Sequence, residues 1–274
     1  WAIIPDSVVK AHHDMKGTMW AGLLSGGANV VLNAIFVFVF HWGILGIAVS
    51  TVLGRIAGLL FALNRAAKHE RGRRNETSNF PLNSLRHPVK AILTLAVPSS
   101  ITYLLMAFES VAVLFLISEL SDESITTPLL AAWSIFDRTL RFLLMPAVAC
   151  SVAFLPLAAR YVGVSRVSAI RGEMRVAMKA SYIYILIFVL PLSWLLGPWL
   201  AEVLSDTPAT RGYAAEGMPF LSVAVIAGTP FFLSRSIFDG LQKPRPGFLA
   251  SMIRTFLFFI PCMTLGYYLA RVME

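Results

Sequence analysis

Residues 64–90 read NRAAKHERGRRNETSNFPLNSLRHPVK, a polar and strongly basic segment that lies between two long apolar stretches. The next connection along the chain, 119–126, holds three acidic residues and no base. The alternation continues, because segments 160–179 and 235–254 are basic while 201–216 is mainly acidic. Cytoplasmic loops of membrane proteins retain lysine and arginine, whereas translocated loops do not. The pattern predicts a polytopic membrane protein with its basic loops in the cytoplasm.

The composition predicts that the apolar stretches are transmembrane helices. The chain is 57% hydrophobic and 14% charged, whereas soluble domains hold about 25% charged residues. Because lipid-facing backbone must form its hydrogen bonds within its own segment, we expect an all-α helical bundle. Each stretch is long enough for the roughly 20 residues that cross a bilayer. We predict seven spans, at about 18–40, 43–63, 91–118, 128–158, 178–200, 214–235 and 248–270.

The basic segment 64–90 is also the candidate boundary between domains. Its polar composition and its prolines predict a flexible cytoplasmic linker, with an amphipathic stretch at residues 80–85 that lies on the membrane. The linker separates two spans in residues 1–63 from five spans in residues 91–274. Transporters usually consist of matched halves. The unequal division therefore predicts further helices beyond both ends of this chain.

Several classes of function are disfavoured by the same sequence. The formal net charge of +8 comes from the basic loops, so it is expected to orient the protein and attract membrane lipid rather than nucleic acid. The sequence contains no phosphate-binding loop and no acyl-transfer motif. We therefore expect neither enzymatic activity nor an organic cofactor.

Cysteines and histidines do not predict a metal or redox site. Cys150 and Cys262 lie inside apolar spans, where small buried side chains are the simplest interpretation. His12, His13 and Asp14 precede the first span without a complementary cluster of cysteines or histidines. We expect these three residues in a solvated loop and predict no metal site.

Glu109 is the most informative single residue. It lies far from either end of its apolar stretch, ITYLLMAFESVAVLFLI, and a rise of about 1.5 Å per residue places it in the outer half of the bilayer. An ionisable group at that depth is costly, and it usually faces a cavity or a partner. Glu109 is therefore a candidate for ion coupling. The alternative is a partnered glutamate that only holds two helices together.

The following span supplies polar residues at a similar depth. Asp137 and Arg141 are four residues apart and share one face of the helix, with Arg138 beside them. We therefore predict that Asp137, Arg138 and Arg141 join Glu109 in a transport or ion-coupling cluster. A salt bridge between Asp137 and Arg141 with no role in transport is equally compatible with the spacing.

Two other polar positions lie in the spans. Asn29 and Asn33 share one face of the first span, so they are candidates to line a cavity, although packing against a neighbouring helix is the favoured interpretation. Arg254 lies near the inner end of the last span, and we expect its guanidinium to extend to the membrane surface.

Residues 16–55, KGTMWAGLLSGGANVVLNAIFVFVFHWGILGIAVSTVLGR, resemble the fifth and sixth helices of multidrug and toxic compound extrusion (MATE) transporters. Residues 96–100 resemble the start of the seventh helix, 145–163 the eighth helix with its loop, and 238–246 the loop before the eleventh helix. The positions that carry the first match are Lys16, Asn29, Asn33, Gly43, Gly46, Ala48, Thr51 and Arg55.

The resemblance implies a fold and a site. The chain would cover helices five to eleven of a twelve-helix transporter, in which two six-helix bundles surround a cavity that opens alternately to each side. Glu109 resembles the family's seventh-helix glutamate in face and depth, although it lies about one turn farther from Pro98. The aspartate that some members carry in the tenth helix has no counterpart near Gly228, which leaves sodium and proton open as the coupling ion.

Together these observations predict a cation-coupled antiporter in the cell (inner) membrane that exports amphipathic, cationic small molecules. Its partners would be that substrate, membrane lipid and the remaining helices of the same transporter. A flippase for lipid-linked sugars or polysaccharides is the alternative within the superfamily, because Arg138 and Arg141 resemble the arginines of such cavities. A seven-helix receptor or membrane scaffold is the alternative of another class. The substrate, the stoichiometry and the oligomeric state stay open.

Overall fold

A computed structural model of the chain describes residues 3–76, 88–119, 123–163 and 168–273. Every regular element in these ranges is helical, which confirms the predicted all-α class. The chain divides into two compact units, Trp1–Leu85 and Arg86–Glu274.

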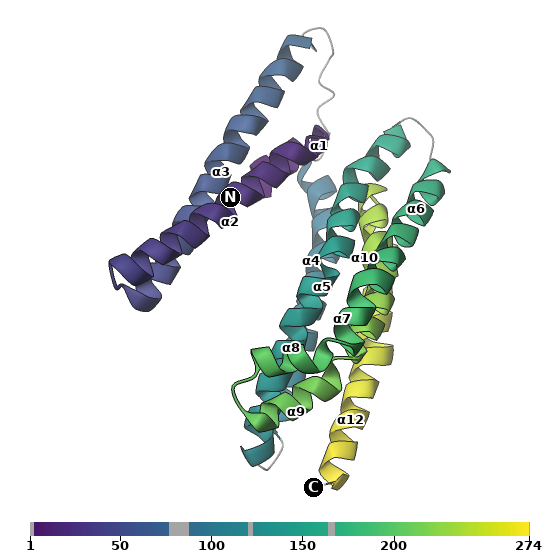
Figure 1. Cartoon of the computed structure of the whole chain (residues 1–274). Helices are drawn as coiled ribbons and strands as arrows, with labels where there is room; N and C mark the ends of the chain where they lie inside the picture. The colour runs from purple at the N-terminus through teal and green to yellow at the C-terminus, as the bar shows by residue number, and fades with distance from the viewer. Residues whose placement is uncertain (1–2, 77–87, 120–122, 164–167, 274) are drawn as a thin grey trace. The chain divides into compact units, whose positions relative to one another are not determined.

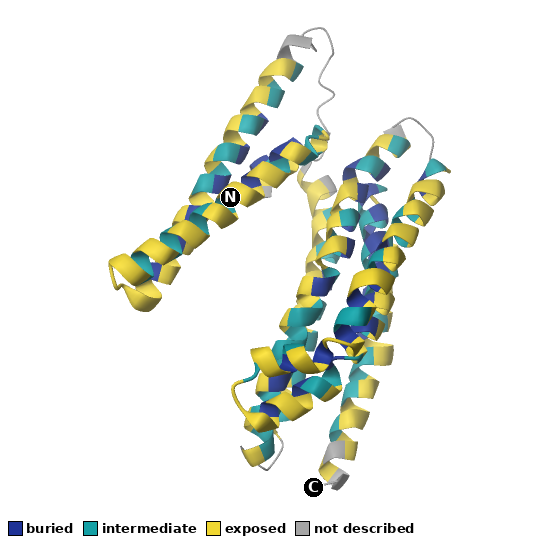
Figure 2. Cartoon of the chain, viewed as in Figure 1, coloured by how far each residue is buried: buried dark blue, intermediate teal, exposed yellow. Residues whose placement is uncertain are grey.

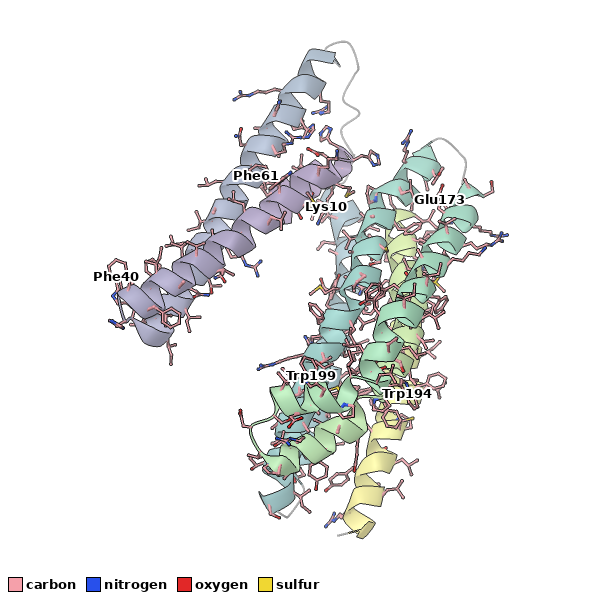
Figure 3. The ribbon with its side chains drawn as sticks, in the orientation of Figure 1. Lys10, Phe40, Phe61, Glu173, Trp194 and Trp199 are labelled. Carbon is pink, nitrogen blue, oxygen red and sulfur yellow. The ribbon has the colours of Figure 1, made fainter. Side chains whose placement is uncertain are left out.

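The first unit is a helical hairpin with a short helix at its open end. It consists of α1 (Ile3–Ala11), α2 (Met15–Ala34), the π-helical turn η1 (Ile35–Val39) and α3 (Gly43–Glu76). Helices α2 and α3 run antiparallel (Figure 1). At the turn between them the Trp42 ring packs on Phe36 and Phe40, with centroids 5.2 and 5.6 Å apart, and Figure 3 labels Phe40 there. Aromatic side chains of this kind favour the membrane–water interface.

A stripe of small residues on α3 allows the two helices of the hairpin to pack closely. A Cβ atom added at Gly54 would lie 2.8 Å from the carbonyl oxygen of Ser25, and one at Gly58 would lie 2.8 Å from the Ser25 Cβ. Small residues four positions apart are a common basis for helix association in membranes. The stripe is buried along its length and comprises Gly46, Ser50, Gly54, Gly58, Ala62 and Ala66.

We expect Gly54→Leu to destabilise the hairpin, because the added side chain would overlap the backbone of α2. Overpacking of this kind costs about 1–3 kcal/mol. The matched control is Gly22→Leu, because a Cβ at Gly22 meets nothing within 4 Å. The thermal unfolding of the detergent-purified protein measures the effect. Equal losses in the two variants would contradict close packing at Gly54.

Asp14 fixes the junction between α1 and α2. Its carboxylate accepts a hydrogen bond from the Gly17 backbone N–H at 2.9 Å and caps α2. It also accepts from Arg65 Nε at 2.6 Å and lies 2.8 Å from His69 Nε2, both on α3. Hydrogen bonds from Arg65 and His69 hold the pKa of Asp14 well below its usual range. Residues 12–14 form a connection, as expected, and His13 is exposed, but His12 and Asp14 are partly buried against α3 rather than solvated.

Two substitutions of Asp14 should distinguish how much stability its helix cap contributes from how much its charge contributes. Asp14→Ala removes both and should cost about 1–3 kcal/mol of stability, whereas Asp14→Asn keeps an acceptor for the cap and should cost less. Because folding lowers the Asp14 pKa, its contribution is complete above the unfolded pKa and declines as the pH falls. Unfolding measured at a series of pH values from neutral to acidic should show that the difference in stability between the wild type and Asp14→Ala becomes smaller as the pH falls. A constant advantage would contradict the pairing.

The second unit contains the remaining spans and a pair of short helices. Helix α6, the π-helical turn η2 and α7 follow one another without a break, as do α11, η3 and α12, and each series forms one span. The short helices α8 and α9 lie together at one end of the unit (Figure 1). Its elements are α4 (Pro88–Ser118), α5 (Glu123–Gly163), α6 (Ala169–Tyr184), η2 (Ile185–Val189), α7 (Leu190–Trp194), α8 (Gly197–Leu204), α9 (Pro208–Gly217), α10 (Phe220–Gly240), α11 (Pro244–Ile253), η3 (Arg254–Phe259) and α12 (Ile260–Met273).

The core of the second unit lies between α5 and α10, and most outer faces are exposed (Figure 2). Its buried side chains include Leu143, Val189, Leu221 and Val225. Exposed apolar side chains cover the rest of the spans, as expected for surfaces that face lipid or further helices. Cys150 and Cys262 are free, with Cys150 partly buried and Cys262 exposed rather than buried.

Among the described residues, seven helices are long and apolar enough to cross a membrane, in agreement with the predicted number. Their bounds differ from the prediction at several ends. Residues 64–76, predicted as linker, continue α3, while residues 77–87, including the predicted amphipathic stretch, lie outside the described residues. The predicted span 178–200 ends at Trp194, because α8 begins as a separate helix with Pro198 in its first turn.

Two predicted connections also contain helical structure. The acidic connection 201–216 holds the end of α8 and most of α9, which starts at Pro208 with the Thr207 side chain as its cap. The basic connection 235–254 is shorter than predicted, because α10 extends to Gly240 and α11 begins at Pro244. The positions of the charged residues therefore predicted the end of α10 too early and the start of α11 too late.

Candidate functional site

The carboxylate of Glu109 on α4 is paired with Arg254, the first residue of η3. Arg254 Nη2 donates to Glu109 Oε1 at 2.9 Å and to Oε2 at 2.7 Å. The buried Thr255 hydroxyl donates to the same carboxylate. The Glu109 side chain is 14% exposed and that of Arg254 is 33% exposed. The expectation that Arg254 extends to the membrane surface is therefore wrong, because its guanidinium turns towards the carboxylate on α4.

Arg254 also contacts a third helix. Its guanidinium carbon lies 4.6 Å from the centre of the Phe231 ring on α10, in a cation–π arrangement. Its Nε atom is buried and has no hydrogen-bond partner among the described residues. Arg254 therefore links α4 and α10 to the last span through its charge.

The polar residues of α5 form a second pair. Arg141 Nε lies 2.8 Å from Asp137 Oδ2 within the same helix. Arg141 Nη2 also donates to the Ser110 hydroxyl on α4 at 3.2 Å, one residue from Glu109. Arg138 is exposed and has no ion-pair partner in the part of the chain that the structure describes. The four residues predicted as one cluster are thus divided, since Glu109 pairs with Arg254 and Asp137 with Arg141.

A third pair connects α10 to α4 and was not found from the sequence. Arg235 Nε lies 3.9 Å from Asp239 Oδ2, and the Arg235 side chain is only 8% exposed. The Arg235 guanidinium lies 4.2 Å from the centre of the Tyr103 ring, while Ser99 donates to Asp239 at 3.4 Å. The spacing of four residues between Arg235 and Asp239 is typical of a pair on one helix face. The basic residues of 235–254 instead predict a connection there, so the pair was missed.

Asn29 and Asn33 form a hydrogen-bonded chain between α2 and α3. Asn33 Nδ2 donates to Asn29 Oδ1 at 3.3 Å, and Asn29 Nδ2 donates to the Thr51 hydroxyl at 3.2 Å. The Ser50 hydroxyl donates to Asn33 Oδ1. These bonds favour the interpretation that the asparagines hold the two helices of the first unit together.

The Glu109–Arg254 pair has the chemistry of an exchangeable site. A carboxylate among apolar helices needs a positive partner, and removing that partner costs far more than losing a pair in water. A proton, a sodium ion or an organic cation can neutralise the same carboxylate. Any of these would compete with Arg254, and the contact between α4 and the last span would then change.

The observations define a multi-pass helical membrane protein with one charge pair between two spans and two further pairs within spans, among the residues that the structure describes. The MatE family model matches residues 98–264, which is more than half of the chain. The chain therefore belongs to the MatE family, and the resemblance inferred from the sequence is confirmed. No curated protein matches the chain in sequence.

Solved structures share the same fold. A mutant of the Vibrio cholerae MATE transporter VcmN is 21% identical with a TM-score of 0.84, over 97% of this chain and 59% of that chain. A Pyrococcus furiosus transporter of the MOP superfamily, described as having a binding pocket of reversed polarity, is 20% identical with a TM-score of 0.82, over 97% of this chain and 58% of that chain. An outward-facing multidrug resistance MATE transporter is 19% identical with a TM-score of 0.79, over 93% of this chain and 56% of that chain.

These matches identify the kind of protein. The chain spans less than two thirds of the length of each of these transporters, as expected for part of a twelve-helix fold. The family and the fold are those of a multi-pass membrane transporter. The alternative of a seven-helix receptor or scaffold is therefore set aside.

We expect the Glu109–Arg254 pair to behave as a coupled unit when its stability is measured. Arg254→Met should cost about 3–5 kcal/mol, because it leaves a carboxylate without its cation. Adding Glu109→Gln to that variant should recover much of the loss. A double-mutant cycle on the unfolding of the purified protein measures the coupling.

The control for this cycle is Arg211→Met. Arg211 pairs with Glu202 at 3.3 Å between α9 and α8, and both side chains are largely exposed. Its loss should cost no more than about 1 kcal/mol. Additive effects of the Glu109 and Arg254 changes would show that the two groups do not depend on each other.

Proposed function

We propose that the chain is part of a cation-coupled antiporter that exports amphipathic, cationic small molecules by alternating access. The observation that carries this proposal is the Glu109 carboxylate, which lies inside a span and is neutralised by Arg254 from a different span. Sodium or a proton would be the coupling ion, and no organic cofactor is needed. The remaining helices of the transporter would complete the cavity.

The mechanism follows from competition for one carboxylate. In the resting state Arg254 neutralises Glu109, and Thr255 donates a further hydrogen bond to it. A proton or sodium ion that reaches Glu109 would release Arg254, and a cationic substrate that binds afterwards would displace the ion. Because these species exclude one another, export of one requires entry of the other. Since Arg254 belongs to another span than Glu109, each exchange would also change a contact between helices.

The orientation in the membrane follows from the distribution of charge. The basic residues of α3 beyond Leu63 and those at the start of α6 favour the cytoplasm. The short helices α8 and α9, which carry Glu202 and Glu216, would then lie on the outer side. We propose the cell (inner) membrane as the location, with the basic loops in the cytoplasm.

A second candidate function is the flipping of lipid-linked sugars or polysaccharides. Glu109, Asp137 and Asp239 each lie beside an arginine, so the carboxylates of these spans are already neutralised. Arg138 adds a positive charge with no ion-pair partner among the described residues. This excess positive charge would suit an anionic substrate, and Arg138 and Arg141 would be its contacts.

Transport in vesicles tests the leading proposal. The complete transporter would be reconstituted, and dye export would be compared under imposed sodium and proton gradients. Glu109→Gln should abolish gradient-driven export while membrane insertion stays normal, because an amide cannot exchange a proton or bind sodium by charge. The matched control is Glu216→Gln on α9, where the side chain is exposed and outside the spans. Unchanged export in Glu109→Gln would overturn the proposal.

Two further measurements separate the alternatives. If Glu109 only supports the structure, the double variant Glu109→Gln with Arg254→Met should regain transport together with stability. If it couples the ion, that variant should be stable and inactive. Movement of a lipid-linked sugar across the vesicle membrane, lost in Arg138→Gln and independent of Glu109, would favour the flippase.

A further inference from the structure

A basic cavity of about 500 Å³ lies in the first unit, where α1 meets the end of α3. Five of its six lining residues have basic side chains. His12 lies in the turn that follows α1, and the others lie on one face of α3, since they are separated by three or four residues. The lining residues are His12, Arg65, Lys68, His69, Gly72 and Arg73.

The positive charge of this cavity is only partly neutralised. Asp14 lies beside Arg65 and His69. Glu70 lies 2.8 Å from Arg73 Nη2 and 3.2 Å from His12 Nε2. Lys68 is exposed and forms no ion pair with the residues that the structure describes. Among the described residues, Lys68 is thus a permanent cation that neither Asp14 nor Glu70 neutralises, and the basic lining of the cavity favours an anion.

The walls of the cavity are held in place before any ligand binds. The rings of His12 and His69 stack with centroids 5.1 Å apart and planes 12° apart, so α1 is fixed against α3. Asp14 engages only the Nε donor of Arg65 at 2.6 Å, and a guanidinium has five N–H donors. The planar arrangement of these guanidinium donors matches the oxygen atoms of a phosphate group.

Gly72 provides the space that an anion would occupy. It lies on the basic face of α3, between the positions of Lys68 and Arg73 along the helix, and a Cβ added there would meet nothing within 4 Å. A larger side chain at this position would fill the cavity without disturbing the fold. A substitution of Gly72 therefore changes the space in the cavity without changing its charge, and a substitution of Lys68 changes its charge.

We expect the cavity to lie near the lipid headgroups, because it is at the polar end of the second candidate span, Gly43–Arg73. It begins at Arg65, just after the apolar part of the second span, while the first span begins at Met15, three residues after His12. Clusters of lysine and arginine beside transmembrane helices attract anionic lipid. A phosphate on a lipid headgroup could therefore enter from the membrane surface, and a free phosphate could enter from the water.

We infer that this cavity is a binding site for a phosphate-bearing anion, supplied by an anionic lipid headgroup or by a free phosphate. Lys68 contributes a charge that no carboxylate among the described residues neutralises, and Arg65 supplies the N–H donors that Asp14 does not engage. The inference does not depend on the proposed transport activity, because it rests on residues of the first unit alone.

Binding can be measured on the purified transporter in lipid nanodiscs. Thermal unfolding would be compared in phosphatidylcholine alone, in phosphatidylcholine with phosphatidylglycerol, and in phosphatidylcholine with added inorganic phosphate. Stabilisation by phosphatidylglycerol only would identify a lipid headgroup as the source. Stabilisation by inorganic phosphate would identify a soluble ligand. No stabilisation by either would overturn the inference.

Three variants distinguish a specific binding site from non-specific electrostatic attraction of anions to the basic helix. Lys68→Gln should weaken the apparent affinity about fivefold, the effect expected for one base near a membrane surface. Gly72→Leu should weaken it as well, although it leaves every charge in place. Arg71→Gln is the matched control, because Arg71 is an exposed base on the same helix that does not line the cavity. Equal losses in Lys68→Gln and Arg71→Gln, with none in Gly72→Leu, would show that charge alone attracts the lipid and would overturn the site.

Discussion

Charges among lipid-spanning helices need opposite charges, and this requirement organises the second unit. Glu109 on α4 finds Arg254 in the last span, while Arg235 and Asp239 on α10 contact Tyr103 and Ser99 of α4. Since an unpaired charge would be far more costly than an unmade surface pair, these contacts determine which faces of the helices meet. Helix α4 takes part in both sets of contacts, through Glu109 and through Ser99 and Tyr103.

The first unit is held together in a different way. Along the membrane-spanning part of its hairpin, small residues such as Gly54 and Gly58 allow backbone contact, and Asn29 and Asn33 add hydrogen bonds between the helices. Polar pairing replaces this packing at the open end, where Asp14 joins α1 and α2 to α3. The basic cavity therefore has fixed walls, although it lies at the end of a long exposed helix.

Proline and π-helical turns give the spans local departures from ideal helix geometry. The turns η2 and η3 are followed closely by Pro191 and Pro261, which cannot donate a backbone hydrogen bond. Local widening of a helix lets its backbone groups find new partners beside such a proline. In η3 this widened turn contains Arg254 and Thr255, so the partner of Glu109 lies where the helix is least regular. Such turns are frequent at functional sites.

The sequence alone determined the number of spans, their helical nature and the family, because apolar length and loop charge are local properties. It also offered the Asp137–Arg141 pair as one of two interpretations, since residues four apart on a helix are neighbours, and the structure contains that pair. Only the tertiary structure decided the partner of Glu109, because Arg254 is 145 residues away and periodicity within one helix cannot report which helix lies opposite. The basic cavity also depends on the tertiary structure, because it forms only where α1 folds back against the basic end of α3.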